Sequence, residues 1–241
     1  MTENQTSNQE MSFTAAGFSS GIIKSLPMAI GVVPFGMVFG VMARQTGLGF
    51  GEAALMSAAV FAGAAQFVAL GLWQESLPVL TIAFTTFLVN LRLVLMGAAL
   101  RPYYGSLSSL KAYGSMLVLS DGGWAMQLQE FNDGKRDAAF LLGNGVAQYV
   151  VWVGSTVLGF MLGAAITQPE KWGLTFIVPA SFLALLVGMW RGKSDILPWL
   201  VAAIAALLTN FAIGGNWFIL VGGLAGSLTG AFIRHREQFN E

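Results

Sequence analysis

Long apolar runs separated by short polar loops make up most of the chain. Most of the runs approach the roughly 20 residues that a helix needs to cross the hydrocarbon core of a bilayer. They lie at about 17–43, 52–73, 78–104, 113–128, 138–166, 173–190, 196–213 and 217–233. None alternates apolar and polar residues as a membrane β-strand does. The pattern predicts an all-α polytopic membrane protein, built as a bundle of spanning helices.

The run at 113–128 decides how many times the chain crosses, because it is short and contains the carboxylate of Asp121. Basic residues gather on the cytoplasmic side of membrane proteins. If this run is a short or re-entrant segment, nearly all basic residues fall on one side, and only Lys24 and Lys171 oppose them. This distribution favours about seven spanning helices with the N-terminus outside. Eight spans with both ends inside are the alternative.

Composition agrees with a single membrane domain over 17–233. Of the 241 residues 55% are apolar and only 10% are charged, against about 25% in soluble proteins. Residues 1–16 are polar and lack Lys and Arg, so we expect a flexible tail rather than a signal peptide, and 234–241 form a C-terminal tail.

The sequence also narrows the classes of function. Basic and acidic residues balance, so the net charge does not indicate a nucleic-acid partner. The chain has no Cys, and its single His lies in the C-terminal tail. We therefore expect no enzyme activity, no cofactor and no metal site.

Asn90 and Arg92 lie inside the apolar run at 78–104. An Arg near the centre of a spanning helix costs about 3 kcal/mol on insertion scales, so it normally faces a partner or a water-filled cavity. Asp121 carries the opposite charge in a neighbouring apolar run. We predict that Arg92 and Asp121 form an ion pair or face the same cavity.

Two further positions are candidate site elements. Pro34, Phe35 and Gly36 interrupt the first run, and they predict either a half-helix whose N-terminus faces a substrate carboxylate or an ordinary kink without a ligand. Gln66 is the polar exception in a helix of small residues, where it serves as an interhelical hydrogen bond or as a ligand.

Four motifs taken together resemble the AzlC family, the large subunits of two-component branched-chain amino-acid exporters of bacteria. The motifs are Pro34-Phe35-Gly36, Phe61 to Phe67, Asn90-Leu91-Arg92 followed by Met96 to Arg101, and Ser120 to Ala125. The resemblance covers residues 20–235. It implies a multi-pass protein of the bacterial inner membrane that acts with a small AzlD-type membrane subunit and exports valine, leucine, isoleucine and, in some members, methionine. Many relatives have His where this chain has Leu93 and an acidic residue where it has Gly122.

The residues and the resemblance together predict a secondary transporter driven by an ion gradient, with protons as the expected ion. We expect Arg92 and the break at Pro34 to bind the substrate carboxylate, and Asp121 and Asn90 to bind its ammonium group. Gln66 is assigned to gating or packing, and Phe35 to the apolar side chain. A channel, a structural membrane subunit, or a transporter of another small amphipathic metabolite are the alternatives.

Overall fold

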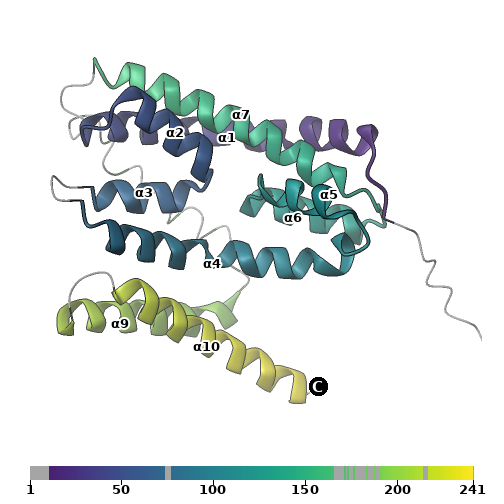
Figure 1. The fold of residues 1–241 in the computed structure, drawn as a ribbon. Helices are drawn as coiled ribbons and strands as arrows, with labels where there is room; N and C mark the ends of the chain where they lie inside the picture. Colours follow the sequence, from purple (N-terminus) through teal and green to yellow (C-terminus); the bar gives the residue numbers. More distant parts are fainter. Residues whose placement is uncertain are drawn as a thin grey trace, which may run out of the picture.

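Every regular element that the structure describes is a helix (Figure 1). The computed structural model describes residues 11–73, 77–165, 192–213 and 217–240, with single positions at 171, 173, 176, 183, 187 and 190. Four helical segments are long and apolar enough to cross a membrane: Ala15–Gln45, Val79–Tyr104, Ala139–Leu162 and Lys193–Ala212. The prediction of an all-α membrane protein is confirmed. The run predicted at 173–190 lies mostly outside the described residues.

Helices α1 (Ala15–Gln45) and α7 (Ala139–Leu162) run side by side in the same direction. At their starts, the Ser12 amide donates to the Arg136 carbonyl, and the Thr14 hydroxyl bonds the Asp137 carboxylate. At the other end, the Arg44 guanidinium lies 5.2 Å from the Phe160 ring. We call these the Asp137 end and the Phe160 end of the bundle. Ser12 and Thr14 are thus bonded to the start of α7, and α1 begins at Ala15.

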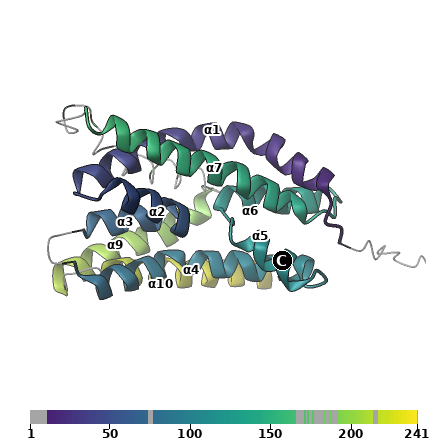
Figure 2. The ribbon, with the colours of Figure 1, turned by 45° about the horizontal axis from the view of Figure 1, so that its top comes forward.

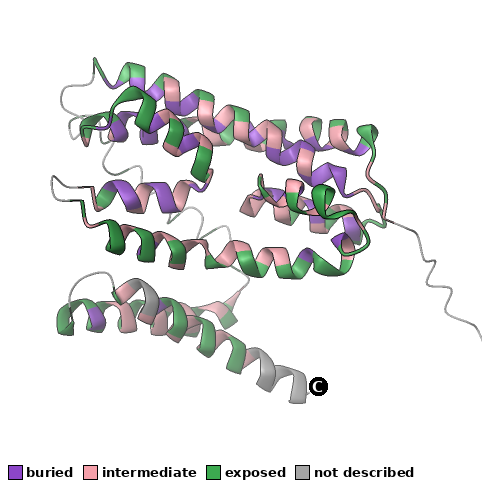
Figure 3. Ribbon diagram, viewed as in Figure 1, coloured by how far each residue is buried: buried purple, intermediate pink, exposed green. Residues whose placement is uncertain are grey.

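The two central helices touch through glycines. A Cβ on Gly40 would overlap the Thr156 carbonyl oxygen, and one on Gly159 would overlap the Met37 carbonyl oxygen. Small residues at such positions let helix backbones approach closely in membranes. Burial in the described chain is accordingly concentrated along α1 and α7 (Figure 3).

The second apolar run is not one helix. It forms α2 (Phe50–Val60) and α3 (Gly63–Gly71), which meet at Phe61, a residue with a left-handed φ of 41°. The hairpin starts beside Phe160, whose ring lies 5.7 Å from that of Phe50, and its turn at Phe61 reaches the Tyr149 ring in mid-bundle at 5.2 Å. Helix α3 then returns toward the Phe160 end (Figures 1 and 2). The prediction of a single helix over 52–73 is therefore wrong.

A second hairpin enters from the Asp137 end. Helix α4 (Val79–Tyr104) ends there, since the Tyr104 hydroxyl donates to the Ala138 carbonyl at 2.9 Å. Helix α5 (Ser109–Met116) leads away from that end, and α6 (Asp121–Asn132) returns to it. The segment predicted as short or re-entrant is thus a pair of short helices broken before Asp121. The two hairpins point toward each other along α1 and α7 (Figure 2).

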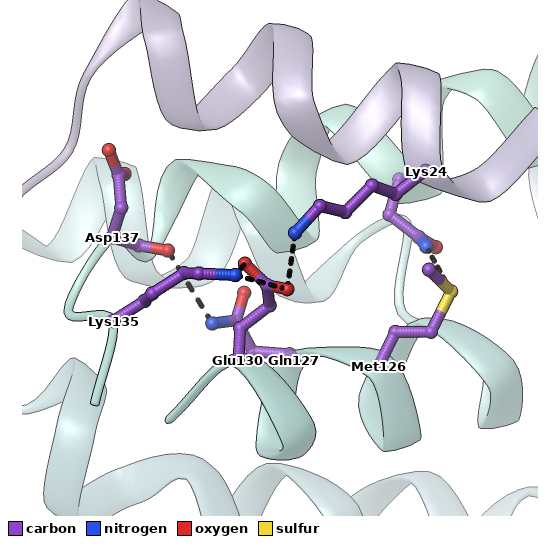
Figure 4. A network of polar contacts seen from close by, with 7 residues as sticks. Lys24, Met126, Gln127, Glu130, Lys135 and Asp137 are labelled. Atoms are coloured by element: carbon purple, nitrogen blue, oxygen red, sulfur yellow. Dashed lines mark hydrogen bonds and ion pairs between the residues drawn. The ribbon is translucent and has the colours of Figure 1, made fainter. Parts of the chain in front are cut away.

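The parallel course of α1 and α7 contradicts the seven-crossing arrangement, which places their starts on opposite sides of the membrane. Lys24 of α1 and Lys135 both bind the Glu130 carboxylate, at 2.6 and 3.0 Å (Figure 4). Lys24 therefore lies on the same side as Lys135, not opposite to it. The seven-crossing arrangement counts the run at 52–73 as one crossing, whereas α3 turns back toward the Phe160 end, from which α2 starts.

The last two described helices form a pair beside α4. Helices α9 (Ile196–Ala212) and α10 (Trp217–Asn240) pack through small residues, with Gly222 facing Ala202 and Ala206. The Trp217 ring lies 5.8 Å from Phe84 near the start of α4. Helix α10 itself continues to Asn240, past the residue at which we ended the last apolar run.

Candidate functional site

A cavity of about 350 Å³ lies where the turns of the two hairpins approach α1, α4 and α7. Ligand pockets in proteins span roughly 300–1,000 Å³, so this one suits a small molecule. Its lining is mostly apolar and comes from α1, α4, α7 and the two hairpins. The lining residues are Met28, Val32, Phe35, Phe61 to Ala64, Phe67, Arg92, Leu93, Leu119 to Gly122, Gln148 and Trp152.

Arg92 and Asp121 form an ion pair at the cavity wall. The Arg92 Nη1 to Asp121 Oδ2 distance is 2.6 Å, and the side chains remain 37% and 46% exposed. The Arg92 Nε is buried and has no hydrogen-bond partner among the described residues. The pair predicted from the sequence is present, and both of its members line the cavity.

Hydrogen bonds of the preceding residue, Ser120, join the start of α6 to α7. Ser120 caps the helix by accepting the Gly123 amide at 3.0 Å, and its hydroxyl donates to Gln148 Oε1 at 3.2 Å. Gln148 Nε2 in turn donates to Asn144 Oδ1, one turn earlier on α7. The N-terminus of a helix carries partial positive charge, and Asp121 lies in the first turn of α6.

The start of α3 brings to the cavity backbone amides that have no hydrogen-bond acceptor among the described residues. Ala62 precedes the helix and has no side chain to cap it, and the first intrahelical bond runs from the Gln66 amide to the Ala62 carbonyl. The amides of Gly63 and Ala64 therefore have no intrahelical acceptor. Both residues line the cavity, so the positive end of α3 borders the same cavity as Arg92.

The expected half-helix at Pro34 is absent, because α1 continues through Pro27 and Pro34. Pro34 is exposed on the outside of the bundle. Gly36 is buried against α7, where a Cβ would overlap Ser155 Oγ. Of the three residues only Phe35 lines the cavity. Of the two alternatives at Pro34, the half-helix is therefore wrong, and a helix N-terminus that borders the cavity is that of α3.

Gln66 supports the cavity without lining it. It is fully buried, and its Oε1 accepts a hydrogen bond from the indole Nε1 of Trp152 at 3.1 Å. Since Trp152 forms part of the cavity wall, Gln66 joins α3 to that wall. This bond is the interhelical contact that the sequence offered as one of two readings for Gln66.

Asn90 is half-buried and does not line the cavity. Its Oδ1 is buried without a partner in the described part of the chain. Within those same residues, no group of three His, Asp or Glu side chains is placed to hold a metal ion.

Three polar or aromatic members of the cavity lining were not assigned to the site from the sequence. Ser120, Gln148 and Trp152 all line the cavity. One signal was available for Gln148, because Asn144 and Gln148 are four residues apart and so share one face of a helix that is otherwise apolar. Trp152 carried no such signal, since an indole in an apolar helix has the same sequence pattern as an ordinary packing residue.

The fold and the site together define a class of protein. Apolar helices enclose an arginine–carboxylate pair, and two helices begin at the same cavity after a break in the chain. Ionisable groups at membrane depth mark substrate or ion pathways, and broken helices at mid-bundle are a recurrent feature of transporters. The architecture is that of a membrane transport protein.

Comparison with known proteins identifies the family. Residues 27–166 match the family model described as AzlC protein. The chain belongs to the AzlC family, a membrane protein family related to branched-chain amino-acid transport. This confirms the resemblance seen in the sequence.

Relatives match along most of their length. An uncharacterized membrane protein of Archaeoglobus fulgidus is 30% identical over 74% of this chain and 78% of its own. The inner membrane protein YgaZ of Escherichia coli is 28% identical over 89% and 90%, respectively. The branched-chain amino acid transport protein AzlC of Bacillus subtilis is 22% identical over 87% and 82%. No solved structure matches the chain significantly.

Proposed function

We propose that this protein is the large subunit of a secondary transporter that exports branched-chain amino acids across the bacterial inner membrane, together with a small AzlD-type subunit. The observation that carries the proposal is the Arg92–Asp121 ion pair in a mostly apolar cavity. A zwitterion with an apolar side chain needs both charges and an apolar wall. The printed name of the Bacillus subtilis relative supports the same substrate class.

The substrate carboxylate would bind Arg92 and the free amides at the start of α3. The ammonium group would bind Asp121. This assignment replaces the predicted role of Pro34, which is exposed, and it leaves Asn90 outside the first layer of contacts. The apolar side chain would lie against Val32, Phe35 and Phe67.

We further propose that both hairpins are re-entrant. At 1.5 Å per residue, α2 with 11 residues and α3 with 9 each span about half of the ~30 Å hydrocarbon core. Irregular backbone at that depth is tolerated where it lines a cavity, as the turn at Phe61 does. Each hairpin would close the cavity toward one face, so that their alternate movement exposes the substrate to either side.

The Asp137 end would be cytoplasmic. Among the described residues, Arg101, Lys111, Lys135 and Arg136 lie at that end, whereas Arg44 lies at the other. Basic residues accumulate on the cytoplasmic face. The N-terminus would then lie inside.

Single cysteines test this topology, and the chain has no native Cys to interfere. We expect Thr46→Cys, in the loop between α1 and α2, to react with a membrane-impermeant maleimide in intact cells. Asp133→Cys, in the loop before α7, should react only after the cells are opened. In the seven-crossing arrangement both positions lie inside, so protection of both in intact cells would contradict our assignment.

Counterflow tests the function itself. Proteoliposomes that contain both subunits and are loaded with unlabelled leucine should accumulate external labelled leucine transiently above its equilibrium level. A channel would equilibrate the label without this overshoot, and a structural subunit would leave it outside. The absence of exchange with both subunits present would refute the transporter.

A further inference from the structure

Met28 of α1 and Gly122 of α6 meet at the wall of the cavity, and both line it. A Cβ built on Gly122 would overlap the Met28 sulfur and would lie 2.7 Å from its terminal Cε. The thioether thus occupies the place that any side chain at position 122 would need. Other glycines of the bundle, such as Gly40 and Gly159, face backbone atoms instead.

This difference decides what a substitution would do. A methionine side chain has three rotatable bonds and adapts its shape to its surroundings. A methyl group at position 122 can therefore be accommodated by moving the end of Met28, without separating α1 from α6. Because Met28 already lines the cavity, the displaced thioether would take up space inside it.

The contact lies close to where the substrate side chain would bind. Gly122 directly follows Asp121, which in the proposed function holds the ammonium group. The amino group and the side chain of an amino acid branch from the same carbon atom, so a wall next to the ammonium partner also borders the side chain. Resting on that function, we propose that the Met28–Gly122 contact sets the largest side chain that the transporter accepts.

The test compares counterflow of valine, leucine and methionine in matched variants. Gly122→Ala should lower the rates for leucine and methionine relative to valine by roughly tenfold, because one methylene group in an apolar pocket changes discrimination by 10- to 200-fold. Met28→Ala should raise the rates for leucine and methionine relative to valine, and it should allow transport of phenylalanine. The double variant should return toward the wild-type ratio, because the smaller side chain makes room for the new methyl group.

Gly114→Ala is the control. Gly114 lies in α5 of the same hairpin, outside the cavity lining, and a Cβ there meets no atom within 4 Å. The rates of this variant for leucine and methionine, relative to valine, should equal those of the wild type. Elution of each variant as a single peak in detergent shows that a change in ratio does not come from misfolding, and Met28→Phe gives a second way to narrow the cavity if Gly122→Ala does not fold.

The outcomes separate this inference from the function on which it rests. Binding of each amino acid is also followed by tryptophan fluorescence, since Trp152 lines the cavity. If the wild type transports and binds leucine but all variants keep its ratios, the Met28–Gly122 proposal is overturned and the function stands. If the wild type neither binds nor exchanges any amino acid, both are overturned.

Discussion

Replacing Arg92 by Ala, or Asp121 by Asn, should lower leucine counterflow by about a hundredfold. Each change leaves the partner charge unpaired at membrane depth, and breaking such a pair in a buried setting costs about 3–5 kcal/mol. The Arg92 and Asp121 side chains are 37% and 46% exposed, so we expect a free-energy cost at or below the lower end of this range. A loss of about 2.7 kcal/mol corresponds to a hundredfold. Counterflow in proteoliposomes with matched protein content measures it.

Three further variants distinguish the pair from a general need for charge. Arg92→Lys keeps the charge but loses the planar fork of donors, so it should retain only part of the activity. The exchange of Arg92→Asp with Asp121→Arg should recover more activity than either single change, but not all of it. A cation at position 121 would oppose the positive end of α6.

Asp133→Asn removes an exposed carboxylate just after α6 and should leave transport unchanged. Single variants at 92 and 121 that lose no more activity than this control would show that the pair is dispensable. Equal losses in the singles and in the exchanged pair would show that the two side chains act separately.

The sequence was sufficient to predict the pair because the underlying free energy is large. An arginine inside a spanning run requires a partner or water, and Asp121 was the carboxylate available in a neighbouring run. The same reasoning gave the helical membrane class, since only helices or closed barrels satisfy the backbone in lipid. Both predictions depend on free-energy costs of several kcal/mol, for an unpaired charge or for unsatisfied backbone groups in lipid, which tertiary contacts rarely reverse.

The positions of the breaks could not be predicted, because they depend on weaker and non-local terms. Pro34 is the stronger breaking signal, yet α1 continues through it. The actual break at Phe61 lies in a run of small apolar residues that favours a helix. It is formed where the Trp152 indole approaches Gly63, at 2.8 Å from the place of a Cβ. Only the fold brings a residue of α7 to that position.

The direction in which the second run leaves the bundle could not be predicted, for the same reason. A run of suitable length was taken as a span, although its break turns it back toward the Phe160 end. If this run is not counted as a crossing, the starts of α1 and α7 lie on the same side of the membrane, and so do the basic residues near them. Lys24 and Lys135 then share Glu130.

Substitution of Gly159 by Ala is expected to cause a large loss of stability. Its Cβ would overlap the Met37 carbonyl oxygen of α1 and lie 2.6 Å from the Met37 Cα. These are backbone atoms, so no rotation of a side chain relieves the clash and the two central helices must separate. Overpacking of a core costs about 1–3 kcal/mol when side chains can adjust, and we expect at least the upper value here. The midpoint of thermal aggregation, followed by size exclusion of the solubilised protein, measures the effect.

Gly154→Ala provides the matched control on the same helix, because a Cβ at that position meets no atom within 4 Å. Alanine favours a helix over glycine by up to about 1 kcal/mol, so this variant should be as stable as the wild type or slightly more so. Gly40→Ala should resemble Gly159→Ala, since it faces the Thr156 carbonyl oxygen from the other helix. Equal aggregation midpoints for Gly159→Ala and Gly154→Ala would show that α1 and α7 are not in backbone contact. The arrangement of the cavity wall that these helices form would then be wrong.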